Sequence, residues 1–115
     1  MNKYPENAGF FEYVLLLLGR RKPIKVTGAS MLPGLKEGDE LFVDERAYDN
    51  HKPAEGDIVV AWHPREADLK IIKRVSVVFD NGCWLVGDNP AESTDSSQYG
   101  IFAFKRIVGK VTSRF

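Results

Sequence analysis

Two side chains, a serine and a lysine, occur in settings that could support chemistry. Ser30 lies in residues 26–35, which read VTGASMLPGL and place a turn directly after an expected strand. Small residues before Ser30 would let a substrate backbone approach its hydroxyl, and backbone N–H groups in such a turn can stabilise an oxyanion. A serine between two strands is a plain turn residue in most proteins, so this segment alone is weak evidence for a nucleophile.

Lys73 lies in residues 69–75, which read LKIIKRV. Because side chains alternate between the two faces of a strand, Lys73 shares a face with Ile71 and Val75, and Lys70 lies on the other face. A lysine drawn inward among apolar neighbours loses the hydration of its ammonium group, so its pKa falls from about 10.4 towards neutrality. The neutral amine can then deprotonate a serine hydroxyl. The competing interpretation is a lysine that extends to water, as most strand lysines do.

A third segment, residues 87–100, reads GDNPAESTDSSQYG and is dense in Asp, Asn and Ser. These side chains hydrogen-bond to nearby backbone groups and fix the shape of a loop. One interpretation is a solvated loop. The functional interpretation is a rigid polar shelf that orients Lys73.

Other common kinds of chemistry are not indicated. His51 and His63 are twelve residues apart and have no cysteine partners, which argues against a zinc site. Cys83 is the only cysteine, which excludes an internal disulfide, and we expect it in a half-buried strand. The 16 basic and 16 acidic residues cancel, so no overall charge favours nucleic acid. We therefore expect no metal, no organic cofactor and no nucleic-acid partner.

The elements that must position Ser30 and Lys73 are a short helix and several strands. The apolar run at residues 10–18, FFEYVLLLL, predicts a helix that Gly19 ends. The run is far shorter than the roughly 20 residues that cross a membrane. We expect its apolar side to pack on the domain. The alternative is a helix in the membrane surface, with the basic residues 20–22 on anionic head groups.

Beyond the helix, short segments rich in Val, Ile, Phe and Trp predict a mostly β domain. Residues 80–82, which read DNG, predict a hairpin whose turn requires positive φ. We expect one domain over 1–115, with the helix and a basic turn in 1–22 and the β core in 23–115. Strands are predicted at residues 24–27, 40–44, 57–62, 69–79, 83–86 and 107–112.

Four segments, in this order, resemble the motif boxes of the signal peptidase I family. The nucleophile box is similar to residues 28–39, the structural strand to 56–60, the general-base box to 72–75 and the last box to 87–100. One box is only moderately specific, whereas four in order are a specific signal, and they cover about residues 24–112. The LLGRR before the first strand and the PAESTDS loop narrow the resemblance to the nickel-type superoxide dismutase maturation proteases.

The resemblance implies an all-β, coiled and barrel-like signal peptidase core with a short N-terminal helix. It also implies roles for four side chains. Ser30 is the nucleophile and Lys73 its general base. Ser93 supplies the hydroxyl that holds the lysine amine, and Asp95 is a carboxylate beneath the site. No metal or organic cofactor takes part.

Gly28 and Met31, which flank Ser30 in the nucleophile box, are expected to support the site. Many members of the family carry a hydroxyl residue at the position of Gly28 as a second oxyanion donor. Glycine cannot supply one, so the backbone N–H of Ser30 is left to form the oxyanion hole.

A second departure concerns the last box. The family's arginine partner of Asp95 is replaced here by Ser97. Arg74 and Arg106 are the alternatives for the missing cation.

The resemblance implies endoproteolysis that removes an N-terminal leader from a protein precursor, through an acyl-enzyme on Ser30. Nickel superoxide dismutase is the expected precursor. The expected location is the cytoplasm, and the alternative is a protein held peripherally at a membrane without a spanning helix.

Three other interpretations remain open. A general signal peptidase acting on exported preproteins would use the same boxes. A catalytically silent module could bind a peptide by strand addition, and Gly28 and Ser97 keep that interpretation open. A self-cleaving LexA-type repressor domain shares the Ser-Met and Lys pattern, but it needs a DNA-binding module and a cleavable linker. The 23 residues before the first expected strand leave little room for either.

Overall fold

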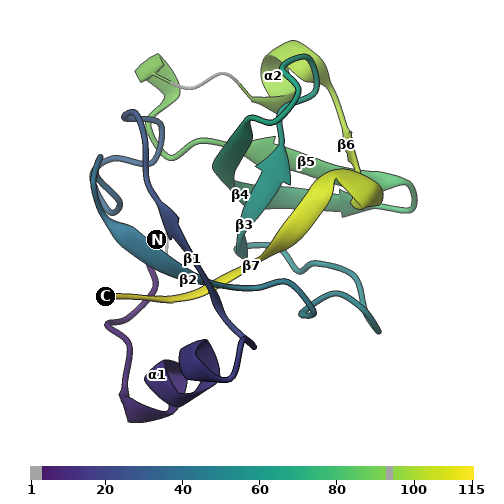
Figure 1. Cartoon of the computed structure of the whole chain (residues 1–115). Coiled ribbons are helices and arrows are strands. Elements are labelled where there is room, and N and C mark those ends of the chain that lie inside the picture. The colour runs from purple at the N-terminus through teal and green to yellow at the C-terminus, as the bar shows by residue number, and fades with distance from the viewer. Residues whose placement is uncertain (1–3, 93–94) are drawn as a thin grey trace.

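The computed structural model describes residues 4–92 and 95–115. Within these residues, seven strands form one antiparallel sheet in the order β1-β2-β7-β3-β4-β5-β6, and the sheet curls (Figure 1). The strands are β1 (Lys22–Lys25), β2 (Glu40–Asp44), β3 (Ile58–Trp62), β4 (Lys70–Phe79), β5 (Gly82–Val86), β6 (Phe102–Ala103) and β7 (Ile107–Arg114). The helices are α1 (Phe10–Leu17) and α2 (Ser96–Tyr99), with 3₁₀ turns η1 (Pro90–Glu92) and η2 (Phe104–Arg106). The predicted all-β class with one short N-terminal helix is confirmed.

The six predicted strands all form, with ends that differ from the prediction by no more than two residues. The largest difference at a strand start is in β1, which begins at Lys22 rather than Ile24. Pro23 is tolerated there because β1 is an edge strand and needs a hydrogen-bonding neighbour on one side only. β6 was not predicted, since two residues are too few to show an alternating pattern.

The β4–β5 hairpin forms as predicted, but its turn differs from the expectation. Phe79 pairs with Gly82, so residues 80 and 81 form the turn, and none of these residues has positive φ. Gly82 is needed for space instead. A Cβ at this position would lie 2.2 Å from the carbonyl oxygen of Phe102 in β6. The glycine therefore reflects the close approach of β5 and β6 and not a left-handed backbone.

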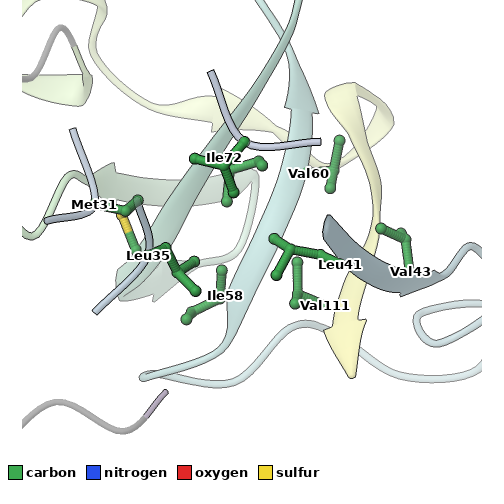
Figure 2. Close-up of a cluster of buried hydrophobic side chains, with 9 residues drawn as sticks. Met31, Leu35, Leu41, Val43, Ile58, Val60, Ile72 and Val111 are labelled. Carbon is green, nitrogen blue, oxygen red and sulfur yellow. The ribbon is translucent and has the colours of Figure 1, made fainter. Parts of the chain in front are cut away.

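β3 is buried on both faces, because its alternate residues enter two different apolar clusters. Ile58 belongs to the first cluster, which Figure 2 shows with Met31 and Leu35 from the turn after β1. Val59, the next residue, belongs to the second cluster. The second cluster consists of Val59, Ala61, Val75, Cys83, Leu85 and Phe102, of which Cys83 is buried and not half-buried as expected. In the adjacent β4, the four residues 72–75 are buried on both faces of the strand, and Lys73 is one of them.

α1 has the predicted ends but only part of the predicted packing. It runs from Phe10 to Leu17, and Gly19 follows with φ of 75°, as expected of the residue that ends a helix. The expectation that its apolar side packs on the domain holds only in part: Val14, Leu15 and Leu16 are half-buried, whereas Phe10, Phe11 and Leu17 are exposed. No residue of α1 is buried, and its glutamate, Glu12, hydrogen-bonds to β7. Across the described part of the chain, no helix has the length and apolar character needed to span a bilayer.

Candidate active site

One pocket contains both residues that the sequence singled out. It lies between β1, with the turn that follows it, and the first half of β4, and its volume is about 210 Å³. Ser30 lines one wall and Lys73 the other, in walls formed by residues 24–31 and 69–73. Three strands separate β1 from β4 in the sheet order. The curling of the sheet therefore brings the two walls together.

The turn that carries Ser30 is fixed by its buried neighbours. Met31 is 1% exposed and packs in the first apolar cluster together with Leu35. The Leu35 N–H donates to the Met31 carbonyl (3.1 Å), and the Leu32 N–H donates to the Ala29 carbonyl (3.2 Å). Met31 thus supports the position of Ser30 by packing in the apolar cluster beside the pocket, and its thioether offers no reactive group.

Gly28 gives the chain its direction into this turn. Its φ is 79°, a left-handed conformation that residues with a side chain rarely adopt. A Cβ there would meet nothing within 4 Å, so backbone conformation and not space requires the glycine. Its N–H donates to the carboxylate of Glu37 (3.3 Å). With no side chain at position 28, the pocket stays open beside Ser30.

Lys73 is buried in the opposite wall, with only 3% of its surface exposed. Ile71 and Val75, on the same face of β4, pack in or against the second apolar cluster, as the alternation predicted. Burial lowers the pKa of Lys73 below its ordinary value of 10.5, and the charge of Asp95 partly opposes this change. Lys70, on the other face, is exposed. The two lysines of this segment therefore differ in the way that the strand register predicts.

Asp95 caps α2 and connects it to the end of β5. Its Oδ1 accepts hydrogen bonds from the N–H (3.0 Å) and the hydroxyl (2.8 Å) of Ser97. Its Oδ2 accepts one from the N–H of Gly87 (3.0 Å). The next residue, Ser96, accepts a hydrogen bond at its hydroxyl from the N–H of Leu85 (2.8 Å). Ser97, at the position of the family's arginine, is therefore itself a hydrogen-bond partner of Asp95.

Arg74 forms a buried ion pair with Asp88. Its Nε and Nη2 donate to the two carboxylate oxygens (2.9 and 2.8 Å), and its Nη1 donates to the carbonyl of Gly56 (2.9 Å). The two side chains are 7% and 2% exposed. The ring of Tyr4 covers the guanidinium, with 5.3 Å between the guanidinium carbon and the ring centre. The guanidinium of Arg74 therefore binds Asp88 and Gly56, and it does not take the place of the family's arginine beside Asp95.

Asn89, the residue after Asp88, holds the turn of Ser30 from the side. Its backbone N–H donates to the Ser30 carbonyl (2.8 Å), and its side-chain amide donates to the Ala29 carbonyl (3.1 Å). Sequence reasoning assigned no role to Asn89. The available signal was its place in the polar segment 87–100, which does not reveal where an amide side chain reaches.

Ser93, which was predicted to hold the Lys73 amine, lies outside the described residues. Arg106, the other candidate for the family's arginine, lines a separate hollow in the surface. Within the residues that the structure describes, no group of three or more His, Cys, Asp or Glu side chains is placed to hold a metal ion.

Comparison with known proteins identifies the family. Residues 10–78 match the family described as signal peptidase, peptidase S26. The matched range includes both walls of the pocket, with Ser30 and Lys73. The chain belongs to this family, and the family predicted from the motif boxes is confirmed.

The relatives include proteins from mitochondria and bacteria. The mitochondrial inner membrane protease subunit 1 of Mus musculus is 29% identical over 76% of this chain, and the mitochondrial ATP-independent inner membrane protease subunit 1a of Arabidopsis thaliana is 30% identical over 77%. A Synechocystis protein named "Probable signal peptidase I-1" is 30% identical over 89% of this chain and 76% of its own length. The match spans 65% of the length of the mouse protein. The narrower resemblance to nickel-type superoxide dismutase maturation proteases remains a prediction.

Replacing Asn89 by alanine should loosen the turn of Ser30, because the hydrogen bond to the Ala29 carbonyl is lost. We expect the free energy of unfolding to fall by about 1 kcal/mol in a urea titration. Amide hydrogen exchange, followed by mass spectrometry, should accelerate in residues 28–35. Asn81→Ala, in the exposed β4–β5 turn, is the control and should change neither quantity. Equal exchange at residues 28–35 in the two variants would show that the Asn89 side chain does not hold the turn.

Proposed function

We propose that the protein is a serine endopeptidase in which Ser30 is the nucleophile and Lys73 the general base. The observation that carries this proposal is that a serine at a turn and a lysine with a lowered pKa line the same pocket. Burial favours the neutral amine, which is the form of lysine that can accept a proton. Membership of the signal peptidase family supports the same chemistry.

The reaction would proceed through an ester on Ser30. As the Ser30 Oγ attacks the carbonyl carbon of the scissile peptide bond, the Lys73 Nζ takes the hydroxyl proton. The tetrahedral intermediate then breaks its C–N bond, and the Lys73 ammonium gives its proton to the leaving amine. In the second half, Lys73 takes a proton from the attacking water and returns it to the Ser30 Oγ as the ester bond breaks.

The oxyanion of the tetrahedral intermediate needs a hydrogen-bond donor beside Ser30. Within the described part of the chain, the Ser30 N–H donates no hydrogen bond to another backbone group. Asn89 holds the Ser30 and Ala29 carbonyls from the other side. We propose that this N–H points to the developing oxyanion, since Gly28 has no side chain to supply a second donor.

An extended peptide fits between the two walls because both present a strand edge. Within the described residues, β1 lies at the end of the sheet and pairs with β2 alone. Residues 70–72 of β4 pair with β3 on one side, whereas pairing with β5 begins at Arg74. Such edges bind a peptide main chain by strand addition. A catalytically silent peptide-binding module would use the same edges, so a catalytic test must separate the two functions.

We propose the leader of a nickel superoxide dismutase precursor as the substrate. The motif resemblance supports this choice, and chemistry gives the step a purpose. In the mature dismutase, the resemblance implies, the new N-terminal amine and nearby thiolates bind nickel. With the leader attached, that nitrogen belongs to an amide, which is a poor ligand unless deprotonated. Cleavage would therefore precede metal binding, with the cytoplasm as the proposed location. Exported preproteins are the alternative substrates.

The dyad predicts two inactive variants. Ser30→Ala should lower the cleavage rate by about 10⁴- to 10⁶-fold, because the covalent nucleophile is lost. Lys73→Arg should be equally inactive, because a guanidinium group keeps its proton and cannot act as a base. Rates are measured with the precursor in excess, and melting temperatures show whether each variant is folded.

Lys70→Arg is the matched control, because the Lys70 side chain is exposed on the opposite face of the same strand and the substitution keeps both the charge and the main chain of this pocket wall. It should retain native activity. Loss of activity in Lys70→Arg with retention in Lys73→Arg would overturn the general-base assignment. Residual cleavage by a folded Ser30→Ala protein would overturn the nucleophile. If the native protein binds the precursor but never cleaves it or reacts with a serine-directed acylating probe, the silent module is the better interpretation.

The cleavage rate should rise with pH as Lys73 loses its proton. Because burial lowers the pKa of Lys73, the midpoint of the rise in kcat/KM should lie below pH 10.5, the ordinary lysine value. Asp95→Asn should move the midpoint to lower pH, because the negative charge of Asp95 raises the Lys73 pKa. The profiles of both proteins are compared at constant ionic strength. A flat native profile, or a midpoint that moves upward in Asp95→Asn, would contradict this assignment.

The substrate is tested by co-expressing a nickel superoxide dismutase precursor with this protein or with its Ser30→Ala variant. We expect mass spectrometry to show a trimmed precursor N terminus only with the active protein. If the leader stays uncut although the protein cleaves other peptides, the proposed substrate is wrong and the proposed peptidase activity still stands. Equal trimming with Ser30→Ala would attribute the cleavage to another enzyme.

A further inference from the structure

The outward side of α1 is apolar, although helices of soluble domains normally turn their apolar side inward. Four side chains make up this outer face of α1 and the residue after it: Phe10, Phe11, Leu17 and Leu18, which are 85%, 70%, 86% and 69% exposed. Single exposed apolar residues are common on protein surfaces, but several gathered on one element mark a surface that binds something.

Polar contacts hold α1 in this orientation. The carboxylate of Glu12 accepts hydrogen bonds from the hydroxyls of Thr112 and Ser113 in β7. The Arg21 Nε donates to Glu12, and its guanidinium lies 3.5 Å from Asp44. Burial tends to raise the pKa of Glu12, but these hydrogen bonds lower it, so the group stays ionised. Rolling the helix to bury Phe10, Phe11 and Leu17 would break the contacts of Glu12 with Thr112, Ser113 and Arg21.

Basic residues border the outer face. Arg20 and Lys22 lie three and five residues after the end of α1, and both are exposed. The acidic residue of the helix, Glu12, is turned towards β7 and paired with Arg21. An apolar helix face bordered by exposed cations complements a membrane surface, with apolar side chains among the acyl chains and cations on anionic head groups.

We propose that the outer face of α1 inserts into the interface of a membrane that contains anionic lipids, with the helix lying in the membrane plane. This contact does not depend on the proposed peptidase activity. Of the two alternatives given for residues 10–22, this proposal adopts the helix in a membrane surface, and not a helix whose whole apolar side packs on the domain.

Shape and area favour lipid over a second copy of the chain. α1 lies at one end of the molecule, outside the curled sheet (Figure 1), and a single helix has a convex outer surface. Its exposed apolar side chains cover on the order of 500 Å², counting aromatic rings at about 150–250 Å² when whole. A stable dimer usually buries about 800 Å² on each partner. Insertion into lipid needs no complementary protein surface.

The membrane contact would also set the orientation of the pocket. β1 begins beside α1 at Lys22 and leads to the turn of Ser30, so α1 and this turn lie beyond opposite ends of β1 (Figure 1). From Lys22, where β1 begins, the chain advances eight residues to Ser30, which span at most about 28 Å when extended. The pocket would therefore open into the aqueous phase above the bilayer. This consequence for substrate access, unlike the membrane contact, rests on the proposed function.

The test is flotation of the purified protein with vesicles of phosphatidylcholine alone or mixed with phosphatidylglycerol. We expect flotation with the mixed vesicles, weakened by salt, and little with phosphatidylcholine alone. The double variant Phe10→Ser, Leu17→Ser should bind about a hundredfold more weakly, because each buried apolar side chain contributes about tenfold. Its melting temperature should be unchanged.

Two matched variants sharpen the test. Val77→Ser with Ile101→Ser alters exposed apolar side chains elsewhere on the surface and should float like the native protein. Arg20→Glu should weaken binding to the mixed vesicles, and it keeps the test decisive if the serine variant unfolds. Absence of native flotation, or equal flotation of native protein and α1 variants, would overturn the proposal. A dimer in sedimentation velocity that the α1 substitutions abolish would assign this face to a second copy instead.

Discussion

The buried ion pair between Arg74 and Asp88 is the contact on which the arrangement of the pocket depends. Arg74 follows Lys73 in β4, and Asp88 precedes Asn89, which holds the turn of Ser30. The pair therefore joins the wall that carries the lysine to the loop whose next residue, Asn89, hydrogen-bonds to the wall that carries the serine. Such a pair is stable only while both partners are present, because a lone buried charge costs about 3–5 kcal/mol.

The proposed general base imposes a second requirement on the pocket. Lys73 must be buried enough for its pKa to fall, and it also lies near the carboxylate of Asp95. The curled sheet covers both faces of β3 and the start of β4 with apolar residues, which lowers the pKa of Lys73. Asp95 acts in the opposite direction, and its position is set by capping α2 and by the N–H of Gly87. The same loop thus positions the serine through Asn89 and tunes the lysine through Asp95.

α1 shows that polar contacts can outweigh the burial of apolar surface in a single element. The carboxylate of Glu12 accepts hydrogen bonds from two hydroxyls of β7 and pairs with Arg21. The ring of Tyr13 packs edge-on against Phe42, with 5.3 Å between the ring centres. These contacts leave Phe10, Phe11 and Leu17 largely in water, while Leu15 and Leu16 are half-buried. Such an arrangement is stable in the fold but leaves a surface that favours an apolar environment.

The sequence by itself determined the strands, the ends of α1, the hairpin and the family, because alternation, turn residues and motif boxes are local patterns. It also marked Ser30 and Lys73 as candidates. Only the tertiary structure decided that the Asn89 side chain donates to the carbonyl of Ala29, which lies 60 residues earlier in the chain. It also decided the orientation of α1, because Glu12 accepts a hydrogen bond from Thr112, which lies 100 residues later. Such contacts depend on where the chain returns in space, and a local pattern carries no information about that.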